Sequence, residues 1–159
     1  MLFCERTLPE SKRVALVAHD NRKQDLLNWA QTNSTLLANH QLFATGTSGQ
    51  LIEGSLGIPV HKYLSGPLGG DQQIGASIAE GNIDALIFFW DPFEPMPHDP
   101  DVKALLRVAA VWNIPVACNR ATADMLIHSP EFAKAYDTLV PDYDQYLLSR
   151  TETSADSRS

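Results

Sequence analysis

The sequence predicts an α/β protein: a single three-layer domain with a mainly parallel, open sheet of about five strands and helices on both faces. Two observations predict this class. Short apolar runs alternate about five times with segments of helical periodicity. The length of 159 residues suits one domain with a sizeable core, and we expect residues 1–159 to form it.

The first expected strand is the apolar run Arg13–Ala18, which reads as a buried strand. Asp20 or Asn21 is expected to cap a helix after it. The apolar face of that helix is predicted to contain Leu26, Trp29, Ala30 and Leu37. Further strands are expected at 42–45, 59–63, 85–90, 115–118 and 138–140.

Helical spacing and capping residues predict the elements between those strands. Further helices are expected from Leu51 and Ile52, from Asp71 through Ile74 and Ile78, after the cap Asp99 through Trp112, at 122–128 and at 143–150. Four prolines make 91–100 a loop. Residues 151–159 are small and polar, and they predict a disordered tail.

Composition excludes several classes of function. The net charge of −7 argues against a nucleic-acid partner, and no apolar run is long enough to span a bilayer. The start Met1–Arg6 lacks the apolar region of a signal peptide, so we expect a cytoplasmic protein. Cys4 and Cys118 have no metal-type spacing and are expected to be free thiols.

Polar residues follow four of the expected strands at the point where each strand ends. They are His19, Thr45 to Ser48, Ser65 to Asp71, and Asp91 to Asp101. In open parallel sheets, ligands bind at the carboxyl ends of the strands. We therefore expect these residues to meet at one site.

The stretch 64–73, Leu-Ser-Gly-Pro-Leu-Gly-Gly-Asp-Gln-Gln, is the most distinctive of these segments. Its glycines let backbone N–H groups approach a ligand, and Asp71 adds a carboxylate at the expected start of a helix. A plain turn with Asp71 as a helix cap is the simpler interpretation of this loop taken alone.

The stretch Thr45-Gly46-Thr47-Ser48-Gly49 offers hydroxyls and N–H groups that suit a phosphate. It has neither the Gly-Lys-Thr/Ser ending of a Walker loop nor a dinucleotide Gly-x-Gly-x-x-Gly pattern, so it indicates a small phosphorylated compound rather than a nucleotide. Lys23 could add a positive charge. A capped helix with exposed hydroxyls is the alternative.

The histidines and carboxylates suggest acid–base chemistry. His19 and His98 lie at a strand end and in a loop, and carboxylates beside a phosphate site suit proton abstraction from a carbon acid. The cluster His98-Asp99-Pro100-Asp101 would also be compatible with a metal, although the chain has no paired histidines at helical spacing and no cysteine ligands.

Taken together and in order, five motifs resemble bacterial methylglyoxal synthases over about residues 6–150. They are Val17-Ala18-His19-Asp20, Ala44-Thr45-Gly46-Thr47, Leu64-Ser65-Gly66-Pro67 with Gly69 to Gln73, Phe89-Trp90-Asp91-Pro92, and Pro97-His98-Asp99-Pro100-Asp101. The resemblance implies a cytosolic homohexameric lyase that forms methylglyoxal and inorganic phosphate from dihydroxyacetone phosphate. It also implies no metal or organic cofactor, and inhibition by phosphate.

The resemblance implies roles for individual residues as well. Asp71 corresponds to the catalytic base, His98 to a group that polarises the substrate oxygens, and Asp91 and Asp101 to acids near the reacting centre. The implied substrate contacts are His19, Lys23, Thr45, Gly46, Thr47, Ser48, Ser65 and Gly66, with His98. Ser48 stands where the family often has Thr, which keeps the hydroxyl.

Two other functions remain open from the sequence. A metabolite-sensing regulatory module of the same fold would share the phosphate site but would not need Asp71 and His98 together. A sugar-phosphate isomerase would form the same enediolate and return the proton to the neighbouring carbon. Arg150 lies within the matched region, and we expect it to reach a neighbouring subunit or a bound phosphate.

Overall fold

The computed structural model describes residues 1–95 and 99–156, with a five-stranded parallel sheet at its centre. The sheet order is β4-β3-β2-β5-β6. Its strands are β2 (Arg13–Ala18), β3 (Gln41–Thr45), β4 (Val60–Tyr63), β5 (Ala85–Phe89) and β6 (Val116–Ala117). The predicted fold class is therefore confirmed, with bounds that differ from the expected ones by one or two residues at most.

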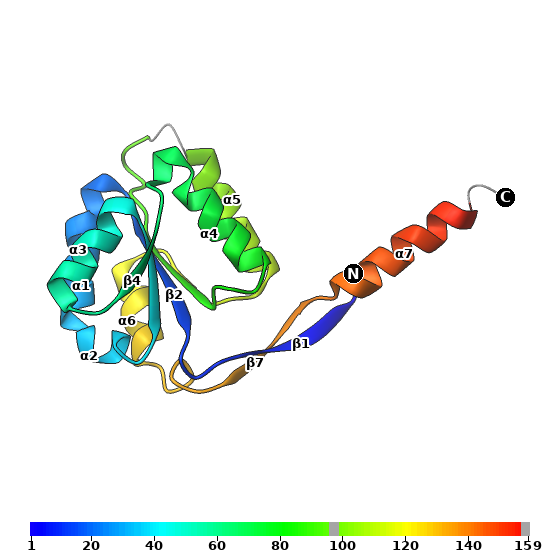
Figure 1. Cartoon of the computed structure of the whole chain (residues 1–159), viewed down its shortest axis with the longest axis horizontal. Coiled ribbons are helices and arrows are strands. Elements are labelled where there is room, and N and C mark those ends of the chain that lie inside the picture. The colour runs from blue at the N-terminus through cyan, green and yellow to red at the C-terminus, as the bar shows by residue number, and fades with distance from the viewer. Residues whose placement is uncertain (96–98, 157–159) are drawn as a thin grey trace.

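Helices cover both faces of this sheet (Figure 1). One face packs against α1 (Lys23–Thr32), α2 (Ser34–Leu37), α3 (Gly46–Leu56) and α6 (Arg120–His128). The other face packs against α4 (Gly70–Ala79) and α5 (Asp99–Val111). The alternation of side chains along a strand decides which residue enters which core: Leu16 packs on the α1 face, whereas Ala15 and Val17 pack on the α4 face.

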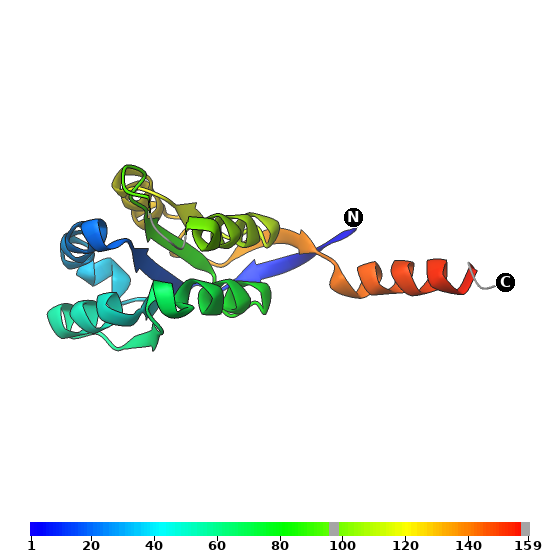
Figure 2. The same ribbon diagram turned by 90° about the horizontal axis from the view of Figure 1, so that it is seen from above.

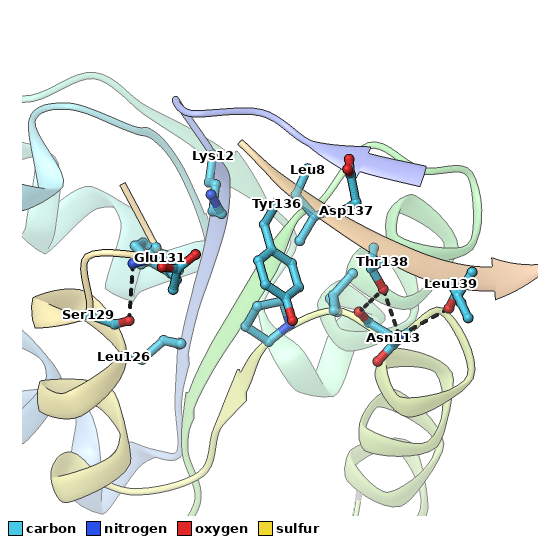
Figure 3. Close-up of a pocket in the computed structure, with 13 residues that line it drawn as sticks. Leu8, Lys12, Asn113, Leu126, Ser129, Glu131, Tyr136, Asp137, Thr138 and Leu139 are labelled. Carbon is cyan, nitrogen blue, oxygen red and sulfur yellow. Dashed lines mark hydrogen bonds between the residues drawn. The ribbon is translucent and has the colours of Figure 1, made fainter. Parts of the chain in front are cut away.

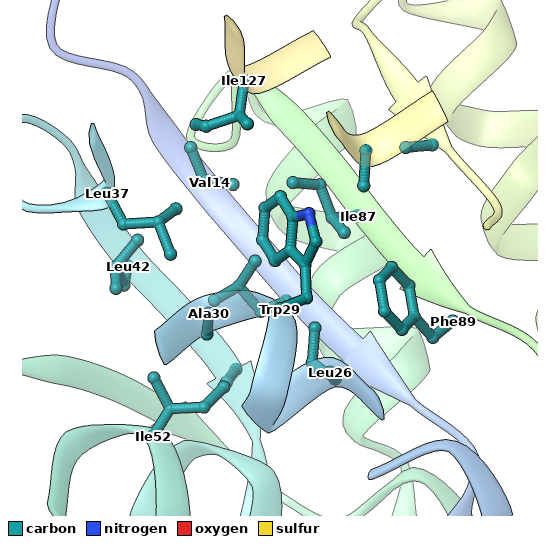
Figure 4. Packing of buried hydrophobic residues seen from close by; sticks show 14 of the residues in the cluster. Val14, Leu26, Trp29, Ala30, Leu37, Leu42, Ile52, Ile87, Phe89 and Ile127 are labelled. Atoms are coloured by element: carbon teal, nitrogen blue, oxygen red, sulfur yellow. The ribbon is translucent and has the colours of Figure 1, made fainter. Parts of the chain in front are cut away.

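The core on the α1 face is built around Trp29, which is fully buried among apolar side chains from β2, β5 and α6 (Figure 4). Its ring meets Phe89 edge to face at 6.0 Å. The indole N–H donates to Asp124 Oδ1 at 2.8 Å, so the one polar atom of the side chain is satisfied. This packing fixes α1 and α6 against the ends of β2 and β5.

The first two expected helices have different bounds in the structure. The helix expected to carry both Leu26 and Leu37 is interrupted at Asn33, whose side chain donates back to the Trp29 carbonyl oxygen. A single turn, η1 (Asp20–Arg22), precedes α1, and neither Asp20 nor Asn21 is its N-cap. The helix expected from Leu51 begins at Gly46, directly after β3.

The chain ends form an arm that extends away from the body, as Figures 1 and 2 both show. Strand β1 (Phe3–Leu8), which no local sequence pattern predicts, pairs antiparallel with β7 (Tyr136–Pro141) in a separate two-stranded sheet. The strand expected at 138–140 therefore exists, but outside the main sheet. Helix α7 (Tyr143–Asp156) continues past Arg150, so the disordered tail expected from residue 151 is wrong as far as Asp156.

A buried carboxylate ties this arm to the body. Asp84, at the start of β5, is fully buried and accepts hydrogen bonds from the Arg13 backbone N–H and from the Arg13 Nε and Nη2 groups, at 2.8 to 2.9 Å. Arg6 of β1 donates to the same carboxylate at 3.0 Å. One carboxylate thus holds the starts of β2 and β5 and the end of β1 together.

We expect Asp84→Ala to lower the free energy of unfolding by about 3–5 kcal/mol, because it leaves two partly buried guanidinium groups without their counter-charge. Urea denaturation followed by circular dichroism measures the loss. The matched control is Glu131→Gln, which removes an exposed carboxylate 4.0 Å from Lys134 and should change stability by less than about 0.5 kcal/mol. Equal losses in both variants would contradict a special role for Asp84.

Candidate active site

The polar segments that follow β2, β3, β4 and β5 meet at the carboxyl edge of the sheet, as the sequence predicts. Two groups of contacts define the site. One joins the start of α3 to the loop before α4, and the other joins the ends of β2 and β5. Because β2 and β3 are neighbours in the sheet, the two groups lie side by side.

Close backbone approach holds the first group together. Gly46 has a φ of +28° and lies directly against Ser65, where a Cβ would overlap the Ser65 hydroxyl. A Cβ on Gly70 would overlap the carbonyl oxygen of Leu64. The loop is also held by Gln73, whose side-chain oxygen accepts the Leu64 N–H at 2.8 Å. Only glycine fits at these two positions.

This packing determines where Asp71 lies. Gly69, with a φ of +106°, is the N-cap of α4, so Asp71 stands in the first helical turn and is not the cap. Its side chain is buried, at 3% exposure. A plain surface turn does not bury the side chain of its carboxylate to this extent. The burial of Asp71 therefore favours the functional interpretation of this loop.

The start of α3 presents a buried hydroxyl to the same region. Ser48 is 5% exposed, and its Oγ has no hydrogen-bond partner among the described residues. Thr45 is buried as the N-cap of α3, and Thr47 is exposed in the first turn. The first N–H groups of an 11-residue helix and this hydroxyl together suit an anion such as phosphate.

The second group is a hydrogen-bonded set around Asp91. The backbone N–H of Asp91 donates to His19 Nδ1 at 3.1 Å, so this nitrogen is the acceptor and a neutral His19 carries its proton on Nε2. The Asp91 carboxylate accepts from the Phe93 N–H at 3.0 Å and from Asn21 Nδ2 at 3.1 Å. His19 is buried and its ring packs edge-on to Phe88.

These contacts hold the pKa of Asp91 below its usual value. The Phe93 N–H contributes most and the Asn21 amide next, because both donate to the ionised form, and the charge of Arg22 adds to them. A carboxylate with a low pKa and both oxygens engaged is a poor base. Its contacts suit it to position His19 and the loop after β5.

The remaining predicted residues lie at the margins or outside the described part. Asp101 is in the first turn of α5 and accepts from Gln72 Nε2 at 3.3 Å, which brings it close to the start of α4. Lys23 opens α1, and its ammonium pairs with Asp20 at 2.8 Å. Gly66 begins the single turn η2 (Gly66–Leu68) after Ser65. His98 lies outside the described residues.

The structure also identifies supporting residues that the sequence did not single out. Asn21, Gln72 and Gln73 hold Asp91, Asp101 and the loop before α4. The signals in the sequence were their polar side chains beside predicted site residues and, for Gln72 and Gln73, their place in the motif that ends at Gln73. Among the described residues, no group of three His, Cys, Asp or Glu side chains is arranged to hold a metal ion. None of the described helices is long and apolar enough to cross a membrane.

A cavity of about 590 Å³ lies at the opposite edge of the sheet, under the start of the arm (Figure 3). Its one buried ammonium, on Lys12, donates to the carbonyl oxygens of Pro9 and Lys134 at 2.9 and 2.8 Å. Burial holds the pKa of Lys12 below its usual value. The described carboxylates of the predicted site and His19 lie at the other edge, and we place the chemistry there.

Fold and site together define an α/β protein that presents a helix N-terminus, a buried carboxylate and a histidine at the carboxyl edge of a parallel sheet. Comparison with known proteins gives the family. An MGS-like domain model matches residues 25–118. The chain is 59% identical over 152 residues to "Methylglyoxal synthase" of Cellvibrio japonicus, covering 96% of this chain and 99% of that one.

Other relatives agree. The chain is 61% identical over 145 residues to "Methylglyoxal synthase" of Saccharophagus degradans, with 91% and 94% of the two chains covered. The crystal structure of methylglyoxal synthase from Elizabethkingia anophelis NUHP1 superposes with a TM-score of 0.84 at 55% identity, covering 91% of this chain and 95% of that one. The chain belongs to the methylglyoxal synthase family. It is therefore an enzyme of the lyase class, and the comparisons do not favour a regulatory module.

The glycine contacts give a test of how the site is built. Gly70→Ala should destabilise the protein and raise hydrogen exchange over 64–71, since its Cβ meets backbone that cannot move aside cheaply. Gly75→Ala lies in the same helix, where its Cβ would meet only Leu105 Cδ1 at 3.9 Å, and should be neutral or stabilising by up to about 1 kcal/mol. Exchange mass spectrometry and urea denaturation measure both. Similar exchange rates over 64–71 in the two variants would contradict this account.

Proposed function

We propose that this protein converts dihydroxyacetone phosphate into methylglyoxal and inorganic phosphate, acting as a carbon–oxygen lyase on a phosphate ester. The curated relatives carry the name of that activity. The single observation that carries the proposal is the buried carboxylate of Asp71, which follows Gly70 in the turn that packs against Thr45, the N-cap of α3. A base next to an anion site is what proton abstraction from a phosphorylated ketone needs.

The phosphate group of the substrate is proposed to bind at the start of α3. The support is the Ser48 hydroxyl, because a buried polar group without a partner costs about 1–3 kcal/mol and a phosphate oxygen would satisfy it. Thr45, Gly46 and Thr47 would contribute N–H and hydroxyl donors from the same turn. Ser65 and Gly66 would close the other side, since Ser65 contacts Gly46 directly. Lys23 is assigned a supporting charge only, because its ammonium pairs with Asp20.

Asp71 is proposed as the base that removes a proton from the carbon next to the ketone. Three carboxylates are candidates for this role. Asp91 is engaged by two donors that keep its pKa low, and Asp101 bonds to Gln72 at the edge of the site, whereas Asp71 is buried within it. We assign Asp91 the role of positioning the loop after β5. We assign Asp101 the role of positioning the start of α5 against the start of α4.

Histidine N–H groups are proposed to stabilise the enediolate oxygens. The tautomer set by the Asp91 N–H leaves Nε2–H of His19 as a donor, and a neutral imidazole can polarise an oxygen without giving up a full proton. His98 is assigned the same task on the strength of the family resemblance alone. No metal or organic cofactor is proposed.

The reaction balances as follows. The base takes a carbon proton, and the electron pair forms the enediolate double bond. The hydroxyl oxygen on the deprotonated carbon then loses its proton and forms a carbonyl, the double-bond pair shifts toward the carbon that bears the phosphate, and the C–O bond to phosphate breaks, provided that this bond stands out of the enediolate plane. The resulting enol tautomerises to methylglyoxal. An isomerase would hold the phosphate in the enediolate plane, so the proposed task of the site at α3 is to hold the phosphate out of that plane.

The experiment for this proposal is deuterium exchange at the reacting carbon of dihydroxyacetone phosphate, together with assays of methylglyoxal and phosphate. Asp71→Asn should fold, still bind a phosphate-bearing analogue, and lose exchange and turnover by about 10²–10⁴-fold, because asparagine has no basic oxygen. Asp101→Asn is the matched control and should keep exchange. Exchange retained in Asp71→Asn but lost in Asp101→Asn would move the base to Asp101. Formation of glyceraldehyde phosphate by the wild type would overturn the lyase assignment.

We further propose that the protein works in the cytosol as a homo-oligomer, a hexamer by family resemblance, with inorganic phosphate as product and inhibitor. The arm supports an assembly, because it exposes large apolar side chains that the body does not cover. They include Met1, Leu2, Phe3, Leu139, Tyr143, Leu147 and Leu148. Helix α7 projects away from the body, beyond the β1–β7 ribbon (Figure 1). Its Arg150 would therefore meet a phosphate or a site of another copy.

Removal of the Arg150 guanidinium tests the assembly proposal. Arg150→Ala should shift the sedimentation profile or the phosphate inhibition curve. Arg107→Ala, on the exposed side of α5, is the control for the loss of one positive charge. Sedimentation velocity and initial rates at several phosphate concentrations give both readouts. Wild-type sedimentation together with wild-type inhibition would remove Arg150 from the proposal.

A further inference from the structure

A cavity of about 530 Å³ opens at the carboxyl edge of the sheet, between the start of α1 and the start of α6. Part of its wall is formed by Phe89 at the end of β5 and by Trp90 and Pro92, which flank Asp91 in the sequence. Among the described residues that line it, none belongs to the site proposed above. It therefore lies beside the candidate active site, toward β6, whereas the start of α3 lies toward β4.

The charged groups of this cavity are two arginines and one carboxylate. Arg22 lies 3.3 Å from Asp25, which lines the same cavity, so one positive charge is largely balanced. Arg120, the first residue of α6, is exposed and has no carboxylate of the described residues within 4.0 Å. Arg22 also acts on the carboxylate of Asp91, between the wall residues Trp90 and Pro92, so the charge that remains for a ligand is that of Arg120.

The rest of the wall is flat and apolar. Phe89 and Pro92 line the cavity, and the indole of Trp90, which is 37% exposed, lies at its surface. An exposed aromatic ring near a guanidinium suits a ligand with a planar group that stacks on the ring and an anionic group that binds the guanidinium. Burial raises the pKa of the Cys118 thiol, so this wall residue stays protonated near neutral pH and offers no nucleophile.

We propose that this cavity binds a small organic anion with a flat apolar body, non-covalently, with the anionic group on Arg120 and the body against Trp90. Neither the phosphate site at α3 nor the base takes part. Asn119 has no part in binding the anion in this proposal. Its side-chain oxygen caps α6 by accepting the Thr122 N–H at 2.9 Å. The volume far exceeds what inorganic phosphate fills, which is why an organic body is part of the proposal.

The test uses ¹⁹F NMR of the full chain labelled with 5-fluorotryptophan. The three tryptophans give three signals, and Trp90→Phe identifies that of Trp90. The probe is phenyl phosphate. Its addition should shift the Trp90 signal in a saturable way and leave the signal of the buried Trp29 unchanged. Inorganic phosphate alone should need at least about tenfold higher concentration for the same shift, because it lacks the stacking body.

Two variants separate this cavity from the active site. Arg120→Gln should raise the midpoint of the Trp90 shift about tenfold, because it removes a charge-assisted hydrogen bond. Lys103→Gln is the matched control: it removes an exposed charge on α5 and should leave the midpoint unchanged. Ser48→Ala, at the proposed phosphate site, should also leave it unchanged.

Three results would overturn the proposal. The first is no Trp90 shift up to about 10 mM phenyl phosphate. The second is a midpoint that follows Ser48→Ala rather than Arg120→Gln, which would put the probe in the active site. The third is a shift by inorganic phosphate at the same concentration as phenyl phosphate. Because none of these readouts involves turnover, failure here leaves the proposed reaction untouched, and failure of that reaction leaves this cavity untouched.

Discussion

The pairing of β2 with β5 is the constraint on which the candidate site depends. The two strands run parallel in register from Val14 opposite Ala85 to Ala18 opposite Phe89. At their amino ends, the buried carboxylate of Asp84 binds the backbone and side chain of Arg13. A slip of one residue would break this contact and turn every side chain to the other face of the sheet. The same register brings His19 opposite the segment after β5, where the Asp91 N–H reaches its ring.

The site divides its polar groups into those that are committed to the fold and those that remain for a ligand. The carboxylate of Asp91 is committed, since two donors hold it and keep its pKa low. The hydroxyl of Ser48 is buried without a partner among the described residues. A protein accepts the cost of such a group where a ligand supplies the missing contact. The division explains how similar residue types at one sheet edge can serve different roles.

The arm differs from the body in that much of its apolar surface is not buried within the chain. Strands β1 and β7 and helix α7 contribute little to the two cores and expose apolar side chains instead. A two-stranded ribbon is marginal in water unless something packs on it. The Arg6–Asp84 contact anchors one end of this ribbon to the body. In the proposed homo-oligomer, another copy of the chain would supply the surface that stabilises the rest, and the stability of the arm would then depend on assembly.

The sequence by itself determined the α/β class, the five strands of the main sheet and the edge at which the polar segments meet. These follow from local patterns: apolar runs as in Ala85–Phe89 and glycines as in 66–70 act within a few residues. Ordered motifs were also enough to indicate the family, which the comparisons confirmed. The bounds were less certain, because Gly46 weakens a helical pattern even though helix α3 begins there.

Only the tertiary structure decided what depends on distant partners. Strand β1 has no strong local signal and is defined by pairing with β7, more than a hundred residues away. What holds a carboxylate of the site also depends on residues from other elements, since that of Asp91 accepts from Asn21 in the turn η1 after β2. Local sequence sets how the backbone can turn. Burial, hydrogen bonding and charge balance arise only when separate segments pack, and those three quantities decide the chemistry of a side chain.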